Sequence, residues 1–272
     1  MAHEGLIERV THAGQRRALG PSVSNRMLVA PDDLRQQSPF ILLVEDFIEP
    51  QGDFHEHPHR GLETVTLILS GSLEHGDHLG SSGVLHSGDV QWMTAGSGII
   101  HGGRPADGST VHGLQLWLNL PNALRKAPPG TRVQRRDAAI MERTQGATAR
   151  TYGKDGNPPW SRTPMTLTDI DIAAGGRYVL KLTPGHRTFV CVIDGNPIVG
   201  GTPCGCGDII WPAIGATEAL LSIAGDRPAR LVAYSGVPID EAVFAGGPFV
   251  AGSEAELQRD FADLRAGNIV SS

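Results

Sequence analysis

Hydrophobic residues along the chain gather in short runs, most of which end at a glycine or a Gly-Asp pair. Short runs that are rich in β-branched and aromatic residues and bounded by turn residues are typical of strands. Many short strands at this spacing favour a sandwich or a small barrel over alternating strands and helices. We therefore predict strands over residues 63–69, 88–93, 113–120, 177–182, 188–193, 207–211 and 229–234.

The two halves of the chain repeat one pattern. Residues 88–92 read Gly-Asp-Val-Gln-Trp, and residues 207–211 read Gly-Asp-Ile-Ile-Trp. Between the halves, residues 121–158 are rich in turn-forming and basic residues and lack apolar periodicity, which predicts a linker or edge segment. The repeat predicts two β domains, residues 1–135 and 136–272.

The last part of the chain carries the signals of an amphipathic helix. Ser253 and Glu256 match a capping box, in which each side chain bonds the backbone N–H of the other residue. Leu257, Phe261 and Leu264 then recur on one face of the helix. The predicted fold is therefore all-β with one short C-terminal helix.

Composition and charge narrow the classes of function. The 35 glycines and 19 prolines in 272 residues argue against a helical bundle. The net charge is −6 and basic residues form no long run, so neither nucleic acid nor an acidic membrane is an expected partner. No apolar run approaches the roughly 18 residues that a membrane span needs. Because the start is polar and unlike a secretory signal, we expect a cytoplasmic protein; no sequence pattern identifies a protein partner.

Histidines carry the candidate chemistry. His57 and His59 lie two residues apart, so on a strand both imidazoles project from one face and can converge on one ion. Pro58 between them donates no ladder hydrogen bond, which predicts an edge strand or a bulge. A surface pair of polar residues would show the same spacing, but His101, at the end of a glycine-rich segment, offers a third imidazole. Of the other histidines, His75 is expected on the surface or in a supporting position.

The spacing of these residues resembles the two-part metal motif of cupins, and the strings around them resemble the pirin family. This resemblance implies a bicupin with two double-stranded β-helix (jelly-roll) barrels. It implies that residues 1–135 bind iron or a similar divalent metal and that residues 136–272 lack a metal site. It also implies a quercetin 2,3-dioxygenase-like enzyme that acts on a flavonol or another chelating small molecule. The strings lie at residues 57–65, 88–96, 98–101 and 113–117, and the ending Gly-Pro-Phe-Val at 247–250 is also similar.

One position departs from the family pattern. The family places a glutamate two residues after the third histidine, where this chain has Gly103. The site is then either three neutral imidazoles with waters or a set completed from elsewhere. Glu63, four residues after His59, is a candidate metal ligand, because other cupins place their glutamate there. The alternative is that Glu63 pairs with Arg60 or with a backbone donor and does not reach the metal.

The missing carboxylate changes the expected chemistry. A divalent ion held by neutral imidazoles alone keeps its full charge and should prefer anionic, chelating substrates. A glutamate can also act as a base toward a flavonol hydroxyl, so its loss weakens the case for quercetin oxidation. The metal could be absent or be another first-row ion. The alternative function is a non-enzymatic regulatory or binding protein, either metal-binding or metal-free.

Overall fold

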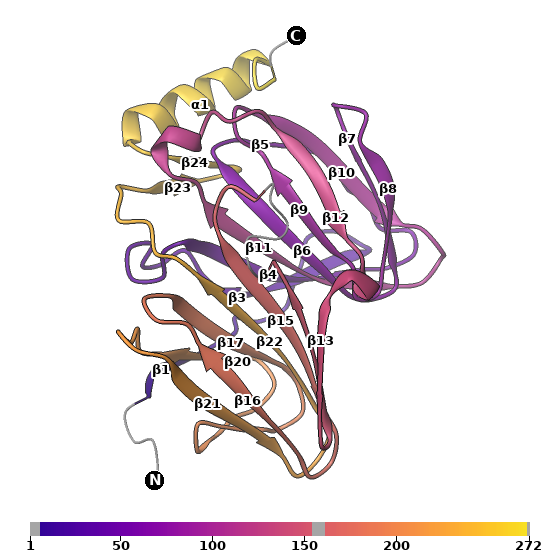
Figure 1. Ribbon diagram of the computed structural model, residues 1–272. Coiled ribbons are helices and arrows are strands. Elements are labelled where there is room, and N and C mark those ends of the chain that lie inside the picture. Colours follow the sequence, from indigo (N-terminus) through magenta and orange to yellow (C-terminus); the bar gives the residue numbers. More distant parts are fainter. Residues whose placement is uncertain (1–5, 154–160, 271–272) are drawn as a thin grey trace. The chain divides into compact units, whose positions relative to one another are not determined.

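The computed structural model describes residues 6–153 and 161–270, which form two compact units (Figure 1). The N-terminal unit comprises residues 15–137, 161–163 and 239–270. The C-terminal unit comprises the described residues among 1–14, 138–159 and 164–238. The chain passes from the N-terminal to the C-terminal unit between residues 137 and 138. The two ends of the chain are exchanged, since the described residues before 15 belong to the C-terminal unit and residues 239–270 to the N-terminal unit.

The N-terminal unit is built from two antiparallel sheets and a short hairpin with a helix. The larger sheet contains, from edge to edge, β12 (Gly130–Gln134), β9 (Val90–Thr94), β6 (Leu62–Ser70), β11 (Val111–Asn119), β4 (Phe40–Ile48), β3 (Val23–Val29) and β2 (Arg17–Ala18). The smaller sheet contains β5 (Phe54–His59), β10 (Ile99–Pro105), β7 (Ser72–Asp77) and β8 (Ser82–His86). The remaining elements are β23 (Phe244–Gly246), β24 (Phe249–Ala251), α1 (Glu254–Ala266) and the 3₁₀ turns η1 (Asn122–Leu124) and η2 (Arg136–Ala138).

The C-terminal unit repeats this arrangement. Its larger sheet contains, from edge to edge, β1 (Ile7–His12), β20 (Asp208–Pro212), β17 (Arg187–Asp194), β22 (Ala229–Gly236), β15 (Met165–Ile172), β14 (Ala147–Tyr152) and β13 (Ile140–Thr144). Its smaller sheet contains β16 (Gly176–Leu182), β21 (Ala219–Gly225), β18 (Ile198–Val199) and β19 (Thr202–Pro203).

The strand order confirms the predicted duplication. Each strand of the N-terminal unit from β2 to β11 has its counterpart eleven strands later, in the same place of the corresponding sheet. The Gly-Asp motifs lead into equivalent strands, with Trp92 on β9 and Trp211 on β20. In the two larger sheets one edge strand differs, since β1 takes the place that β12 has in the N-terminal unit.

Burial explains why these segments form strands. Every residue of β6 except Ser70 is buried, as expected of a continuous apolar run in the middle of a sheet. In β16 buried and exposed residues alternate, so one face packs on the core and the other meets solvent. All seven predicted strands are present. The described part of residues 121–158, expected as a linker or edge segment, holds β12, β13 and β14, and β12 and β13 are sheet edges.

The predicted C-terminal helix is present as α1. The Ser253 side chain accepts a hydrogen bond from the Glu256 backbone N–H, and the chain leaves the helix through Gly267 with a positive φ of 74°. Phe261 packs edge-on against Phe249 of β24, with ring centroids 5.3 Å apart. No helix in the described ranges has the length and apolar character needed to span a membrane.

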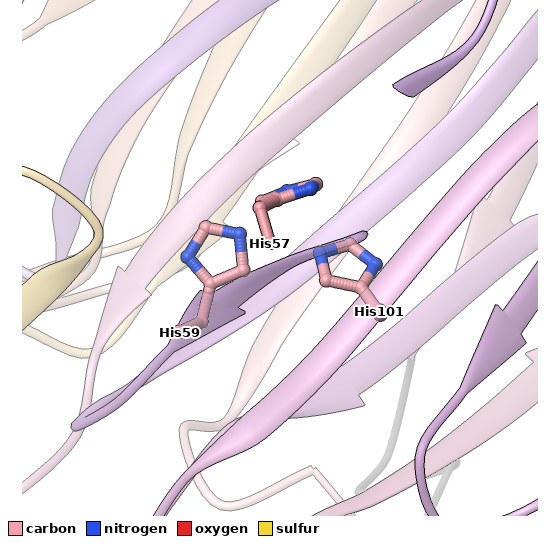
Figure 2. Close-up of side chains that lie close together, drawn as sticks. All are labelled: His57, His59 and His101. Carbon is pink, nitrogen blue, oxygen red and sulfur yellow. The ribbon is translucent and has the colours of Figure 1, made fainter. Parts of the chain in front are cut away.

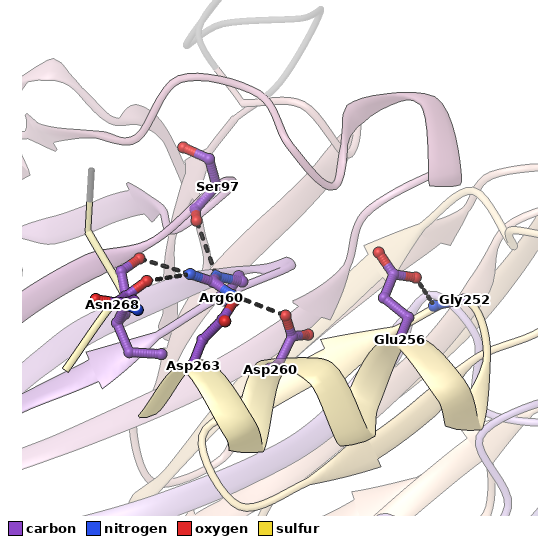
Figure 3. Close-up of polar contacts among 8 residues, drawn as sticks. Arg60, Ser97, Gly252, Glu256, Asp260, Asp263 and Asn268 are labelled. Atoms are coloured by element: carbon purple, nitrogen blue, oxygen red, sulfur yellow. Dashed lines mark hydrogen bonds and ion pairs between the residues drawn. The ribbon is translucent and has the colours of Figure 1, made fainter. Parts of the chain in front are cut away.

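Arg60, the residue after β5, fastens the chain beyond β24 to the N-terminal barrel (Figure 3). Its side chain is 15% exposed and donates five hydrogen bonds. The acceptors are Asp260 Oδ1 at 2.9 Å, Asp263 Oδ2 at 2.7 Å and the carbonyls of Ser97 at 2.9 Å, Asn268 at 3.1 Å and Ile269 at 2.8 Å.

Candidate metal centre

Two neighbouring strands of the smaller sheet position the three histidines. Strands β5 and β10 pair antiparallel, with His57 directly opposite His101 and His59 opposite Ile99. β5 is an edge strand, as Pro58 predicts. Side chains at directly opposite positions and at i, i+2 share one face of a sheet, which places all three imidazoles on the same face.

The three imidazoles lie close together and point toward a common space (Figure 2). Their ring centroids are 4.9 Å apart for His57 and His59, 4.4 Å for His57 and His101, and 5.1 Å for His59 and His101. One ring nitrogen from each lies within 4.8 Å of the other two. Nitrogens bound to one ion at about 2.1 Å lie at most about 4.2 Å apart, so small ring rotations suffice for ligation.

The hydrogen bonds of the rings leave donor nitrogens available for a metal. The Nδ1 of His57 lies 2.8 Å from the His55 carbonyl, and the Nδ1 of His59 lies 3.3 Å from the Pro248 carbonyl. An Nδ1–H that donates to a carbonyl leaves the Nε2 lone pair free, which is the usual arrangement of metal-binding histidines. Within the described chain, Nε2 of His59 and both ring nitrogens of His101 are buried without a hydrogen-bond partner. The residues present therefore fit a divalent metal.

Burial keeps two of the imidazoles neutral. Desolvation, together with repulsion from His57, lowers the pKa of His59 to about 3. Desolvation and the neighbouring histidines lower the pKa of His101 to about 2. Since neutral imidazole is the form that binds metal, both rings are ready for ligation near pH 7 without losing a proton.

A cavity of about 210 Å³ opens beside the histidines and is lined by His57 and His101. This volume corresponds to several water molecules at about 30 Å³ each, so the cavity can hold a small ligand group. Asp46 of β4 also lines it. Burial raises the pKa of Asp46 to about 7, against a hydrogen bond from Asn25. The Asp46 carboxyl group is thus able to exchange a proton with the cavity near neutral pH.

Glu63 stands apart from the three histidines. Its carboxylate accepts hydrogen bonds from Thr94 Oγ1 at 2.6 Å and from the backbone N–H groups of Arg162 at 2.9 Å and Thr163 at 3.0 Å. A further one comes from Ser161 Oγ at 3.2 Å. Burial raises the pKa of Glu63, while these donors oppose the rise. Glu63 therefore holds residues 161–163 on the barrel by accepting hydrogen bonds from them. Arg60, the other partner considered for Glu63, bonds Asp260 and Asp263 instead.

The sequence left His75 either on the surface or in a supporting position, and the structure places it beside the site. The sequence places it in a polar hairpin, whereas the structure buries it on β7, with its ring centroid 5.4 Å from that of His101. It lines the same cavity. The position of His75 follows from the pairing of β7 with β10. That pairing depends on contacts between separate segments, which the local sequence pattern does not reveal.

The C-terminal unit differs at the equivalent positions. Strands β16 and β21 correspond to β5 and β10, and Leu180 lies opposite Leu221 as His57 lies opposite His101. Both leucines, with Tyr178 and Ile223, are buried in the apolar core of that unit. The sheet face that carries the imidazoles in the N-terminal unit thus carries packed apolar side chains in the C-terminal unit.

Comparisons with known proteins agree with this architecture. Residues 11–118 match the family model Pirin, and residues 167–270 match the model of the pirin C-terminal cupin domain. A pirin-like protein of Solanum lycopersicum is 30% identical over 96% of this chain and 91% of its own length. A crystal structure of quercetin 2,3-dioxygenase from Acinetobacter baumannii is 26% identical, with a TM-score of 0.87 over 97% of this chain and 98% of that one. A bacterial pirin from Escherichia coli in complex with nickel(II) is 20% identical, with a TM-score of 0.68 over 85% and 99% of the two chains, and shares the fold.

Proposed function

Because this chain belongs to the pirin family of bicupins, we propose that its N-terminal unit is the metal centre of a quercetinase-like dioxygenase. His57, His59 and His101 are the proposed ligands, and iron is the proposed metal. The substrate proposed is a small molecule that chelates metal, such as a flavonol, and the proposed location is the cytoplasm. The observation that carries the proposal is the group of three imidazoles beside one cavity.

The residues of the chain divide the work as follows. The Nε2 atoms of His57 and His59 and a ring nitrogen of His101 bind the metal. When bound, the metal supplies the Lewis-acid and redox chemistry that a dioxygenase needs. The Asp46 carboxylate accepts the proton of a chelating hydroxyl, a task that the missing glutamate at position 103 leaves open. Trp117 packs edge-on against His59, with ring centroids 4.9 Å apart, so it covers one side of the site and helps to exclude water.

Glu63 is not proposed as a ligand, since its carboxylate already accepts four hydrogen bonds outside the histidine group. The quercetinase-like relatives do not favour the non-enzymatic alternative.

The test is elemental analysis of protein purified without added metal, followed by oxygen-uptake assays after anaerobic Fe(II) loading. We expect about one divalent metal per chain in the wild type and none in His57→Ala and His101→Ala. His55→Ala is the matched control, because its side chain is 90% exposed on the same strand. Equal metal in all four proteins would refute the ligands, and metal binding without oxygen uptake on flavonols or small diketones would refute the enzymatic part.

A further inference from the structure

We propose that His75 is a fourth metal ligand, which supplies in this chain the donor that Gly103 lacks. This inference rests on the metal-binding function proposed above and adds a residue to it. It gives the site four neutral imidazoles and no carboxylate.

Strand register places His75 beside the missing side chain. Strands β10 and β7 pair antiparallel, with Gly103 directly opposite His75 and His101 opposite Asp77. Residues at directly opposite positions project from the same face of a sheet, as do residues at i and i+2 on one strand. The His75 side chain therefore leaves β7 on the face of β10 that carries His101 and from which a side chain at position 103 would project.

The environment of His75 indicates a ligand rather than a packing role. The residue is 5% exposed, and its Nε2 is buried without a hydrogen-bond partner among the residues that the structure describes. A buried polar atom without a partner costs free energy, so such atoms are uncommon unless an ion, a ligand or a water completes them. His75 lines the cavity together with His57 and His101, and its ring centroid lies 5.4 Å from that of His101. Its ring lies outside the group of three and would reach a bound ion after rotation of its side chain.

The close approach of β7 explains why a histidine replaces the carboxylate. A Cβ atom at Gly103 would lie 2.9 Å from the Glu74 carbonyl oxygen and 3.4 Å from Leu73 Cδ1. A side chain at position 103 would thus force the backbone of β7 away. The same approach brings His75 toward the site, so the two features belong to one arrangement. Four imidazoles leave the full charge on a divalent ion and suit nickel, copper, zinc and iron.

The test measures Ni(II) affinity by competition with a chromogenic chelator, and counts bound imidazoles by X-ray absorption spectroscopy of the Ni(II) protein. The variants are His75→Ala and His75→Gln, with His55→Ala as the exposed control and His57→Ala as the control for the site itself. We expect four imidazoles in the wild type and in His55→Ala. Both His75 variants should lose one imidazole and bind at least tenfold more weakly, and His57→Ala should lose binding.

Two results would overturn the role of His75 and leave the three-histidine site standing. One is wild-type affinity in both His75 variants. The other is weaker binding with the same imidazole count as the wild type, which would mean that His75 only positions its neighbours. Absence of Ni(II) binding in the wild type would overturn the proposed metal centre as well. Near-UV circular dichroism shows whether each variant folds. If His75→Ala fails to fold, His75→Gln, which keeps a polar side chain, decides whether His75 is a ligand.

Discussion

Replacing Arg60 by methionine should release the C-terminal segment from the N-terminal barrel. Methionine keeps much of the aliphatic stem of the arginine and removes the guanidinium with its five hydrogen bonds (Figure 3). Asp260, whose side chain is 10% exposed, then keeps its charge without the cation that faces it. Asp263, at 45% exposure, can turn to water instead.

The size of the effect follows from this geometry. Removing one partner of a buried ion pair costs about 3–5 kcal/mol, because the remaining charge is left desolvated. Of the two carboxylates only Asp260 meets that condition, and the lost carbonyl contacts add to its cost. We therefore expect Arg60→Met to lower the free energy of unfolding of the N-terminal unit by about 3–5 kcal/mol. The double substitution Arg60→Met/Asp260→Asn should recover part of this loss, since it removes the stranded charge.

Urea denaturation at pH 7 measures the effect, and hydrogen exchange of the α1 amides locates it. With a slope of roughly 2–3 kcal/mol per molar urea, the midpoint should fall by about 1–2.5 M. Arg104→Met is the matched control, because the Arg104–Glu74 pair is exposed at both ends and should contribute little. Equal midpoints for Arg60→Met and Arg104→Met would refute the reasoning, as would a double variant less stable than the single one.

Further predictions concern the cavity and its metal. The folded-state pKa of Asp46 is raised from 3.8 to about 7, so its ionisation should lower the free energy of unfolding by up to about 4 kcal/mol as the pH rises from about 4 to about 7. Asp46→Asn should abolish this loss, as measured by urea titrations at several pH values. Parallel curves of stability against pH for the two proteins would contradict the prediction. Gly103→Ala should lower the free energy of unfolding by about 1–3 kcal/mol, because the added Cβ would meet the Glu74 carbonyl. Gly83→Ala, whose Cβ would lie in open space on β8, should melt like the wild type. Equal melting temperatures for the two variants would rule out the close approach at Gly103. Ni(II) at about 100 times its dissociation constant should stabilise the wild type by about 2.7 kcal/mol in thermal melts, with no shift for His101→Ala, and a shift in both would mean that the metal binds elsewhere.

The local pattern predicted the strands, and the resemblance to the two-part metal motif of cupins predicted that the three histidines meet. His57 and His59 share a strand face by their spacing alone, and the glycine-rich approach to His101 marks a second strand. Their geometry depends on the antiparallel pairing of β5 with β10, which places His57 opposite His101.

Contacts between distant segments could not be predicted in the same way. Glu63 accepts hydrogen bonds from Arg162 and Thr163, about a hundred residues later, and no short-range pattern reports such partners. His75 faces the site only because the register of β7 places it opposite Gly103. The exchanged chain ends could not be predicted either, because β1 pairs with β20, about two hundred residues later.

The exchange of ends sets an order of events during protein synthesis. The N-terminal unit uses residues 239–270, which leave the ribosome only after all the strands of the C-terminal unit from β13 onward. Until then, the nascent barrel presents the Arg60 guanidinium without the aspartates and carbonyls of the helix region that later surround it. The histidine-bearing barrel is thus completed only after the strands of the other unit have been made.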